Sequence, residues 1–445
     1  MPDIVLRYAA FPILDAFTGC LRRYDLLRSL QWESTQLQRW QDDAVRRLVS
    51  HAYSTVPYYR ERYKAEGVSP SKVRTSEDLA NLPIVTKRDL KLGFPHKTVS
   101  SAVSSLRMKL SHTSGSTGEM FGFYVDTNSR GYVVASRLLF ESWMGLALGD
   151  KTVRLAAFPA EYQDYQTVLK MGWRMRVIGE VRIPISRVEQ DIRTGVKLIR
   201  SLHPASVIGV VSTLSSFAKR ILDAGMDDMM NLQSVATSSE MLLRKDRDLI
   251  GRGFGCPVFD RYGLSEVAGY VAQECHLHQG LHVNSGLAVM EVIKDGQVCG
   301  PGETGRLVVT NLHNHGMPFI RYDTGDLATI GDSCACGRAF PVLARIEGRS
   351  ANWVITESAP VSWTRFLWPL ETMNITSVEH YQFVQTAVGN LTLLVAPKSA
   401  LSSGQVDELA QRLNSIHPLI RVKVETVDSI PLTAGGRRVL FKPLN

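Results

Sequence analysis

Hydrophobic positions follow a helical period in the first hundred residues of the chain. Between residues 31 and 65 they fall on one stripe, and the step Val56-Pro57 predicts a break in the helix. Shorter helices are expected near Glu77 and after Lys87. The chain therefore begins with a helical lead-in, which we assign to residues 1–105.

The middle of the chain alternates short apolar runs with helical segments. The strands expected here are residues 152–158, 206–211, 234–237 and 258–260, and the helices between them are residues 189–202 and 215–224. Strands that alternate with helices are typical of a parallel sheet with helices on its faces. This region therefore predicts an α/β fold.

The pattern changes twice in the last third of the sequence. Residues 281–347 combine short strands with many turns and have no helical period, which favours an antiparallel β subdomain. Beyond Arg349, strands are expected at residues 378–383, 391–395 and 420–426, with a helix at residues 405–416. We place a domain boundary at Glu347-Gly348-Arg349. It separates a large N-terminal domain, residues 1–347, from a small α+β domain, residues 348–445.

Composition and charge narrow the class of protein. With 44% hydrophobic and 21% charged residues the chain has the composition of an ordinary globular protein. Its net charge of +8 favours anionic partners such as nucleotides, but the basic residues are scattered, so nucleic acid is not expected. The sequence shows neither a signal peptide nor a transmembrane segment. Six unevenly spaced cysteines indicate a reducing cytoplasm rather than a disulfide scaffold.

Between Leu106 and Gly122, a loop rich in hydroxyl groups and glycines connects two strand-like segments. Its sequence, His112 to Met120, combines Ser and Thr hydroxyls with glycines that let the backbone approach a ligand closely. This composition suits a phosphate group, although no lysine follows Gly118 as in the P-loop of the common NTPases. A surface loop is the alternative. A long apolar helix is expected after it, at about residues 131–147.

Three further motifs follow the hydroxyl loop in order. Asp260–Glu266 comes after an expected strand, at the edge of an α/β sheet where ligands bind. Arg321–Asp326 ends in an acidic residue suited to accept both hydroxyls of a ribose, and Ile430–Arg438 is a glycine turn with two cations. Each motif alone is compatible with a turn, an ion pair or a solvated loop. Their joint occurrence in this order indicates a nucleotide site.

With these motifs the chain resembles the adenylate-forming, AMP-binding enzymes, and most of all the phenylacetate–CoA ligase branch with its relatives in capsular polysaccharide biosynthesis. The hydroxyl loop matches the phosphate loop of the family, and Tyr262–Glu266 matches its Tyr-Gly-x-Thr-Glu motif. Arg321–Asp326 and Gly348-Arg349 match its aspartate and hinge motifs. The resemblance covers the chain from about Trp32 to near the C-terminus.

The resemblance implies a ligase that joins ATP and a carboxylic acid into an acyl-adenylate, releases pyrophosphate, and then transfers the acyl group to an acceptor. Thr117 and Glu266 would hold Mg²⁺, Asp326 would bind the ribose, and Arg349 would contact ribose or phosphate. Rotation about the hinge would exchange the two half-reactions. The residues implied in binding ATP are Thr113, Ser114, Gly115, Ser116, Thr117, Gly118, Ser238, Ser239, Glu240, Tyr262, Gly263, Asp326 and Arg349.

Several positions depart from the family pattern. Arg437 stands where the family has a catalytic lysine, and its planar fork does not reproduce a compact ammonium. Ala351-Asn352 replaces the acidic pair expected after the hinge, and Met120 replaces a proline after the phosphate loop. Val210-Val211 stands where the branch often has a Tyr/Ser-Pro pair. A rival hypothesis follows, a catalytically reduced homologue that binds nucleotide or acyl-adenylate without full adenylation.

The cysteines suggest a metal site. Cys334-Ala335-Cys336 forms a tight pair of thiols, and Cys275 lies earlier, close to His276, His278 and His282. Thiolates and imidazole suit tetrahedral zinc. The resemblance implies a structural Zn²⁺ bound by Cys275, His282, Cys334 and Cys336, with buried free thiols as the alternative. His313 and His315 are expected in a turn rather than as ligands.

The sequence leaves the substrates open. The segments expected to line the acid pocket are residues 131–143, 209–213 and 236–270, with Glu240 and Glu266 as the charged residues expected at the pocket. An apolar or aromatic acid fits this lining. The acceptor can be coenzyme A, an amine on a sugar or an amino acid, and the oligomeric state is open.

Overall fold

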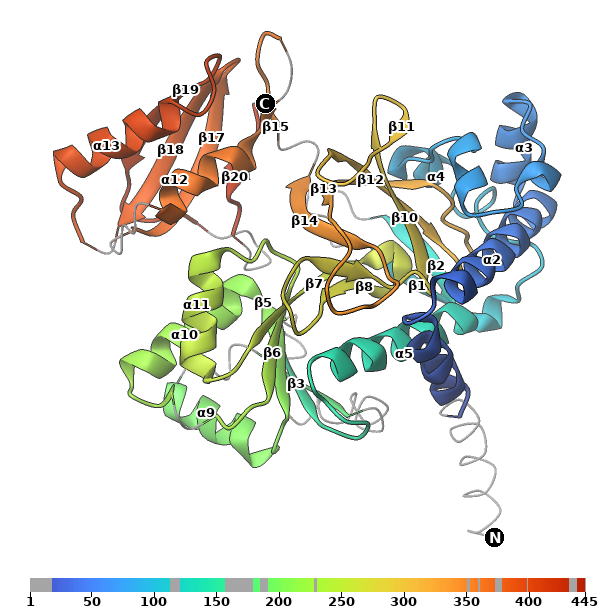
Figure 1. The fold of residues 1–445 in the computed structure, drawn as a ribbon, viewed down its shortest axis with the longest axis horizontal. Coiled ribbons are helices and arrows are strands. Elements are labelled where there is room, and N and C mark those ends of the chain that lie inside the picture. The colour runs from blue at the N-terminus through green and yellow to red at the C-terminus, as the bar shows by residue number, and fades with distance from the viewer. Residues whose placement is uncertain are drawn as a thin grey trace. The chain divides into compact units, whose positions relative to one another are not determined.

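The computed structural model describes residues 18–112, 121–156, 179–184, 191–227, 230–349, 353–358, 361–372, 378–397, 399–431 and 438–444 (Figure 1). Contacts between Cα atoms divide the chain into two compact units. Unit 1 combines Met1–Asp150 with Phe259–Ile346, and unit 2 combines Lys151–Val258 with Glu347–Asn445. The second division falls at the boundary expected from the sequence, while the two-domain assignment stays a prediction.

Unit 1 begins with helices that pack on its own sheet. After helical residues 18–30 come α2 (Ser34–Thr55), α3 (Pro57–Ala65), α4 (Lys87–Gly93) and α5 (Thr127–Trp143). Thr86 begins α4 with a capping box, because its side chain accepts from the Asp89 N–H and Asp89 caps Thr86 in return. The buried Tyr59 hydroxyl ties α3 to the β region, donating to Pro318 O and accepting from Ile320 N.

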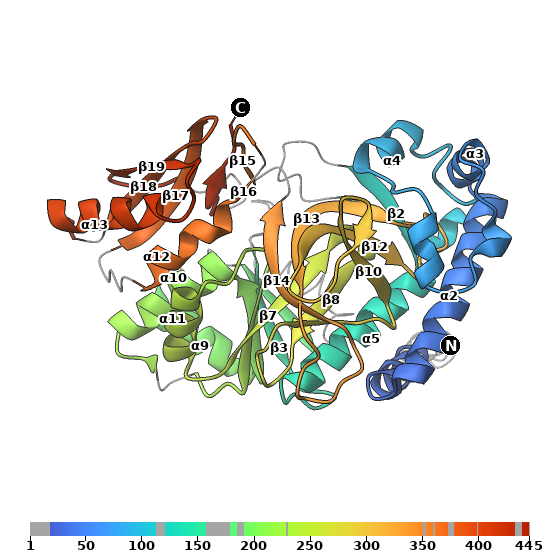
Figure 2. The same cartoon turned by 45° about the horizontal axis from the view of Figure 1, so that its top comes forward.

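The strands of unit 1 form an antiparallel region with the order β11-β10-β12-β13-β14-β9-β8-β7. They are β7 (Val258–Leu264), β8 (Gly269–Glu274), β9 (Leu281–Val283), β10 (Ala288–Lys294), β11 (Gln297–Val298), β12 (Thr304–Asn311), β13 (Tyr322–Ile330) and β14 (Val342–Arg349). Helices α2 to α4 lie beside these strands (Figure 2). A separate hairpin pairs β1 (Met108–His112) with β2 (Gly122–Asp126) in antiparallel register.

Unit 2 contains a parallel sheet with the order β6-β5-β3-β4. Its strands are β3 (Thr152–Ala156), β4 (Glu180–Pro184), β5 (Ser206–Val210) and β6 (Ser234–Ser238), and its helices are α9 (Ile192–Ser201), α10 (Val211–Asp223) and α11 (Arg244–Phe254). All five residues of β6 are buried, which is typical of a strand covered on both faces. Phe217 of α10 and Phe254 of α11 meet in the core of this layer.

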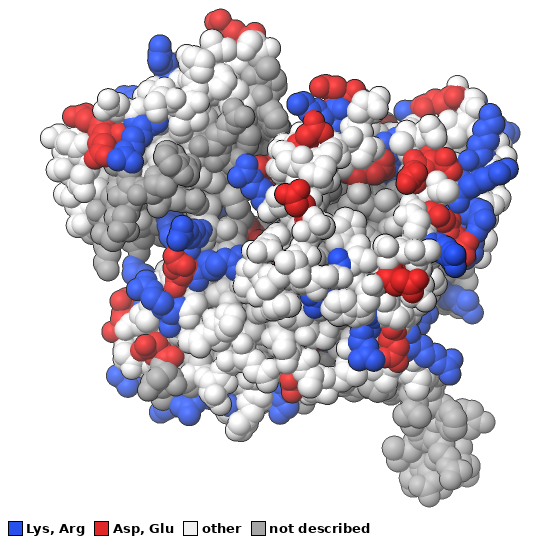
Figure 3. Space-filling view, in the orientation of Figure 1, with Lys and Arg blue, Asp and Glu red and all other residues white. Residues whose placement is uncertain are grey.

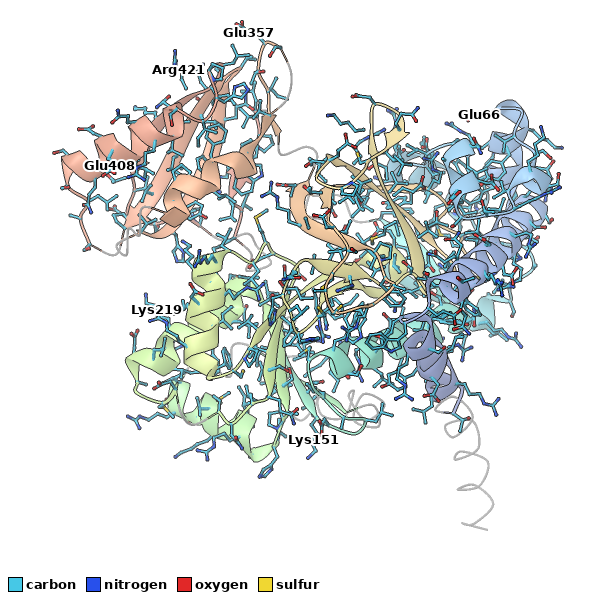
Figure 4. The ribbon with its side chains drawn as sticks, viewed as in Figure 1. Glu66, Lys151, Lys219, Glu357, Glu408 and Arg421 are labelled. Carbon is cyan, nitrogen blue, oxygen red and sulfur yellow. The ribbon has the colours of Figure 1, made fainter. Side chains whose placement is uncertain are left out.

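The C-terminal part of unit 2 is a small α+β element with the strand order β19-β18-β17-β20. It comprises β15 (Trp353–Val354), β16 (Val361–Ser362), α12 (Leu367–Thr372), β17 (Val378–Ala387), β18 (Asn390–Pro397), α13 (Ser403–Asn414), β19 (Arg421–Thr426) and β20 (Phe441–Lys442). Glu408 on α13 and Arg421 on β19 mark two of these elements in Figure 4. Leu409 and Leu413 lie on the buried face of α13 and pack in the core of this element.

The expected fold class is confirmed, with three local corrections. Strand β7 runs to Leu264, so Tyr262-Gly263 lies within it rather than after it, because pairing with β8 extends the strand. Helix α5 begins four residues early, since the Asp126 side chain caps it by accepting from the Ser129 N–H. Helix α10 begins at Val211, directly after β5. Among the described residues no helix has the length and apolar character needed to cross a membrane.

Candidate functional site

Two tyrosine hydroxyls hold two carboxylates in unit 1. The hydroxyl of Tyr262 donates to Asp326 Oδ2 at 2.6 Å, and the hydroxyl of Tyr322 donates to Glu266 Oε1 at 2.9 Å. Both carboxylate residues are buried, each 8% exposed. The geometry thus links the two motifs reciprocally, because each motif supplies one tyrosine and one carboxylate. A buried carboxylate that accepts a hydrogen bond from a hydroxyl group is fixed in orientation.

A β-bulge in β13 sets the position of Asp326. Register with β12 pairs Val308 with Asp323 and Arg306 with Leu327, so three residues of β13 oppose one residue of β12. Gly325 adopts a φ of 73°, which favours glycine at this position. The bulge is closed locally, since the Gly325 N–H donates to Asp323 Oδ1 and the Asp326 N–H donates to Thr324 Oγ1.

Arg321, at the start of the same motif, has a structural role that sequence reasoning missed. Its guanidinium forms a paired contact with Glu291, with Nε 3.1 Å from Oε2 and Nη2 3.0 Å from Oε1. The guanidinium also donates to the carbonyls of Ala80 and Leu82. Burial raises the pKa of Glu291, and the positive charge of Arg321 opposes that rise. The ion pair ties the start of β13 to β10, and the bonds to the two carbonyls tie it to the helical lead-in.

In unit 2, Ser238, Ser239 and Glu240 follow one another at the carboxyl end of β6. Ser239 has a φ of 71°, which turns the chain out of the strand. Glu240 accepts from the Ser212 N–H at 2.7 Å and from the Ser212 hydroxyl at 2.9 Å, at the first turn of α10. The N-terminus of a helix favours a carboxylate in this position. Glu240 also accepts from the Arg438 N–H at 3.0 Å.

Part of the predicted site falls in stretches of the chain that the structure does not describe. The hydroxyl loop with Thr113, Ser114, Gly115, Ser116, Thr117 and Gly118 lies outside the described residues, as do Met120, Ala351-Asn352 and Arg437. Strands β1 and β2 bring the two ends of the hydroxyl loop together, since His112 pairs with Gly122. Arg349 is the last residue of β14. Within unit 1 the structure therefore links Tyr262 to Asp326 and Tyr322 to Glu266. Within unit 2, Ser238 ends β6, and Ser239 and Glu240 follow it.

Cys275, His282, Cys334 and Cys336 form one cluster, whose ligand atoms all lie within 4.8 Å of one another. The sulfurs of Cys275 and Cys334 are 3.7 Å apart, and Cys336 Sγ is 3.4 Å from His282 Nε2. Zinc bonds of about 2.3 Å to sulfur and about 2.0 Å to nitrogen, at tetrahedral angles, separate two sulfurs by about 3.8 Å and sulfur from nitrogen by about 3.5 Å. These two distances match a tetrahedral ion, and the four ligand atoms are close enough together to share one metal ion.

The surroundings of His282 prepare its ring for a metal. Nδ1 lies 3.3 Å from the Phe340 carbonyl, so Nδ1 carries the proton and Nε2 keeps its lone pair on the side of Cys336. Burial lowers the pKa of His282, which favours the neutral ligand form, and burial raises the pKa of Cys275 to about 12. His278 is directed elsewhere, 3.0 Å from Glu274 Oε2. Of the three histidines left open by the sequence, His282 is the one in the cluster.

The charge distribution agrees with the sequence. On the face shown in Figure 3, basic and acidic side chains are interspersed over both units. Surface pairs such as Arg62–Glu66 and Lys97–Glu61 place opposite charges side by side.

Comparison with known proteins identifies relatives along most of the chain. The phenylacetate-coenzyme A ligase of Thermus thermophilus is 28% identical over 366 residues, covering 80% of each chain. Protein CapK of Staphylococcus aureus is 22% identical over 429 residues, covering 93% of this chain and 91% of CapK. A solved structure of 2-hydroxyisobutyryl-CoA ligase, in the postadenylation state with R3-HIB-AMP, has a TM-score of 0.74 at 20% identity and covers 92% of this chain and 89% of that one. No protein-family model matches.

The fold is that of the adenylate-forming enzymes. The chain is similar in sequence to phenylacetate-coenzyme A ligases and to CapK, which confirms the resemblance drawn from the motifs.

Proposed function

We propose that this protein is a ligase that activates a carboxylic acid with ATP as an acyl-adenylate, releases pyrophosphate, and transfers the acyl group to an acceptor. The observation that carries the proposal is the reciprocal pairing of Tyr262 with Asp326 and of Tyr322 with Glu266. It joins two motifs of the family through two hydrogen bonds to buried carboxylates, in a chain that is similar to coenzyme A ligases.

Each carboxylate has a role that suits its setting. Glu266 offers the hard oxygen ligand that Mg²⁺ prefers, and Tyr322 orients it from the side of Oε1. Tyr262 holds the Asp326 carboxylate, which we propose accepts hydrogen bonds from the ribose hydroxyl groups. When bound, Mg²⁺ offsets charge on the phosphates of ATP. The protein then contributes mainly orientation and charge neutralisation, with Thr113–Gly118 proposed to hold the phosphates.

The experiment is a screen for pyrophosphate release with ATP, Mg²⁺ and a broad panel of carboxylic acids. Release that depends on one class of acid supports the proposal, and an apolar or aromatic acid is the class we expect. A Glu266→Gln variant is the matched control, because it removes the proposed Mg²⁺ ligand and keeps the shape of the side chain. No release with any acid contradicts the proposal.

A second function rests on the departures at the C-terminus. Arg437 in place of lysine favours a homologue that binds nucleotide or acyl-adenylate without full adenylation. This hypothesis expects ATP binding without turnover by the natural chain. It also expects an Arg437→Lys variant to gain pyrophosphate release, whereas the ligase hypothesis expects the natural chain to be active.

The acceptor is proposed from the relatives. The similar ligase of Thermus thermophilus is named for coenzyme A, which makes this thiol the first acceptor to test. Amines, on a sugar or on an amino acid, are the second group of acceptors to test. Assay of acyl transfer to each acceptor, after the acid is known, decides between thiol and amine. A cytoplasmic location stays a prediction from the cysteine pattern.

We also propose that Cys275, His282, Cys334 and Cys336 bind a structural Zn²⁺. The support is the closeness of the four ligand atoms, two of whose distances match a tetrahedral ion, and the hydrogen bond that fixes the His282 tautomer. Metal analysis of protein purified without added zinc is the test. About one zinc per chain supports the site. A metal-free protein that is fully stable supports the alternative of buried free thiols.

A further inference from the structure

Three leucines with exposed side chains lie in the segment that runs from α4 to β1. Leu92 is 79% exposed, Leu106 is 95% exposed and Leu110 is 44% exposed. The other large hydrophobic side chains that the structure shows exposed are scattered along the chain, at Trp32, Leu148, Val298, Ile355, Val388 and Leu419. A single exposed hydrophobic residue is ordinary on a protein surface, whereas several in one place mark a contact with a partner.

The three leucines also lie on neighbouring parts of unit 1. Leu92 is in the last turn of α4, and Phe94, two residues later, stacks on Tyr124 of β2 with ring centroids 5.6 Å apart. Tyr124 is the residue opposite Leu110 in the pairing of β1 with β2. Leu106 lies in the short helical turn that leads directly into β1. Figure 2 shows α4 beside β2.

The backbone that carries the leucines is held by contacts with the rest of unit 1. Leu90 of α4 is fully buried. The Ser100 N–H donates to the Gly316 carbonyl at 2.9 Å, and the Thr127 hydroxyl donates to the Arg107 carbonyl at 2.9 Å. The leucines therefore project into solvent from a fixed base, and their exposure is a property of the fold.

Positive charge is concentrated in the same segment. Residues 87–110 contain six Lys or Arg residues and one Asp, a formal net charge of +5, against +8 for all 445 residues. The single acidic residue, Asp89, is engaged as the capping partner of Thr86. A short segment thus carries more than half of the net charge of the protein.

Each exposed leucine has an exposed basic neighbour. Arg88 lies one turn before Leu92 on α4, Arg107 follows Leu106, and Lys109 precedes Leu110. None of these three basic side chains forms an ion pair with another described residue. We call these six residues the basic leucine patch.

The chemistry of the patch selects an anionic lipid surface as its partner. At a bilayer surface, leucine side chains enter the boundary of the acyl chains while Lys and Arg reach the anionic headgroups. A second copy of this chain would instead place like charges opposite each other, which is unfavourable. Nucleic acid would satisfy the charges through its phosphates but offers no acyl chains to the leucines.

We propose that the basic leucine patch docks unit 1 on the surface of an anionic lipid bilayer. The leucines enter the boundary between headgroups and acyl chains, and the three basic side chains contact lipid phosphates. The docking is peripheral, and it does not depend on the proposed reaction.

The test is co-sedimentation of the full chain with sucrose-loaded vesicles. Phosphatidylcholine vesicles with about 30% phosphatidylglycerol supply the anionic surface, and vesicles of phosphatidylcholine alone are the neutral control. We expect binding to the anionic vesicles to be about tenfold tighter or more, and to weaken in about 0.5 M NaCl. Equal binding to both kinds of vesicle, or binding to neither, overturns the proposal.

A variant with both Leu92→Ser and Leu106→Ser tests the insertion of the leucines. Both side chains are mostly in solvent, so the fold should be kept. The net charge is unchanged, and loss of the apolar contribution should weaken binding to anionic vesicles by about tenfold or more. An affinity equal to that of the natural chain contradicts insertion.

The matched control for the leucine variant is Leu148→Ser. Leu148 is also exposed, but it lies beyond the end of α5 that is opposite to Thr127. The length of this helix separates the two ends by about 25 Å. Leu148→Ser should therefore bind like the natural chain, and a loss as large as that of the leucine variant would contradict a role for the patch.

Lys109→Glu and Lys294→Glu test the position of the charge. Both lysines are exposed, and Lys294 is the last residue of β10, outside the patch. The two variants change the net charge equally, but only Lys109→Glu should weaken binding to anionic vesicles, by about tenfold or more. An equal loss in both would show that net charge alone attracts the protein, which contradicts the patch.

An acidic protein is the alternative partner, and polyglutamate is the probe for it. Binding of polyglutamate that Lys109→Glu abolishes, together with no binding to anionic vesicles, would assign the patch to such a protein and overturn the proposal. These assays contain neither ATP nor a carboxylic acid. A chain that releases no pyrophosphate therefore still tests the patch, and failure to bind vesicles leaves the proposed function standing.

Discussion

The hydroxyl of Tyr262 donates a 2.6 Å hydrogen bond to Asp326, a residue 64 positions further along the chain. Tyr262 lies in β7 and Asp326 in the bulge of β13. The same two segments exchange a second bond, from Tyr322 to Glu266. Two motifs that are distant in sequence thus form one arrangement in unit 1, in which each tyrosine orients the carboxylate of the other motif.

Removal of the Tyr262 hydroxyl should weaken the binding of ATP. In Tyr262→Phe the Asp326 carboxylate loses the donor that orients it, and a hydrogen bond to a charged group contributes about 1.5–3 kcal/mol. We expect KM for ATP to rise by about tenfold or more, with a smaller change in kcat. Steady-state kinetics with saturating acid measure both constants.

The control for this prediction is Tyr53→Phe. Tyr53 is half-buried in α2, so the substitution removes a hydroxyl from a similar environment away from the carboxylates. An equal effect of the two variants on KM would show that Asp326 does not depend on Tyr262.

Substitution of Glu266 should alter the requirement for Mg²⁺. Glu266→Gln removes the negative charge that we propose binds the ion, and we expect kcat/KM to fall by about a hundredfold. Tyr322→Phe keeps the charge and removes only its orienting donor, so its effect should be smaller and partly overcome by added Mg²⁺. Titration of activity with Mg²⁺ measures this difference. Glu303→Gln, at an exposed carboxylate of unit 1, should leave the titration unchanged.

The sequence predicted the elements well where the pattern is local. The stripe on α2, the break at Val56-Pro57 and the capped helix α13 all follow from neighbouring residues. It was wrong about the end of β7, because strand length there depends on pairing with β8. The bulge that aims Asp326 likewise depends on β12, although the glycine at position 325 was a visible turn signal.

The candidate site shows the same limit. The motifs identified Tyr262, Glu266 and Asp326 as candidate site residues. Their spacing in the sequence does not show that Tyr322 donates a hydrogen bond to Glu266, or that Arg321 forms an ion pair with Glu291. Those contacts join segments that fold together only in three dimensions. The partner of Arg438 was hidden for the same reason, because Asp246 lies 192 positions earlier in the sequence.

Loss of one thiol should remove the proposed metal. Cys334→Ser takes a thiolate from the four-residue cluster, and we expect zinc content to fall from about one per chain toward zero, with a lower Tm. Cys256→Ser is the matched control, because Cys256 is a free cysteine outside the cluster. Chelator should lower the Tm of the natural chain and of Cys256→Ser equally, and it should leave that of Cys334→Ser unchanged. A Cys334→Ser protein with full zinc would contradict the ligand set.

His313 should make the protein less stable as pH falls. Its ring is buried, stacks on Tyr132 with ring centroids 3.5 Å apart, and donates from Nε2 to the Gly286 carbonyl at 2.8 Å. Burial lowers the pKa of His313 from 6.5 to about 3. The folded state therefore keeps the ring neutral where the unfolded state binds a proton. The stability that depends on the neutral ring is fully present above pH 6.5 and is lost as pH falls from 6.5 toward 3.

The measurement is urea unfolding of the natural chain and of His313→Gln at pH 7.5 and pH 5. Glutamine can donate a hydrogen bond but does not titrate, so the difference in unfolding free energy between the two proteins should shrink by about 2 kcal/mol at pH 5. Taking this difference cancels the other titrating groups, including His315, whose pKa is also lowered by burial. His96→Gln, at an exposed histidine, should leave the unfolding free energy of the natural chain unchanged at both pH 7.5 and pH 5. A difference between the natural chain and His313→Gln that is the same at both pH values would show that His313 titrates normally in the folded protein.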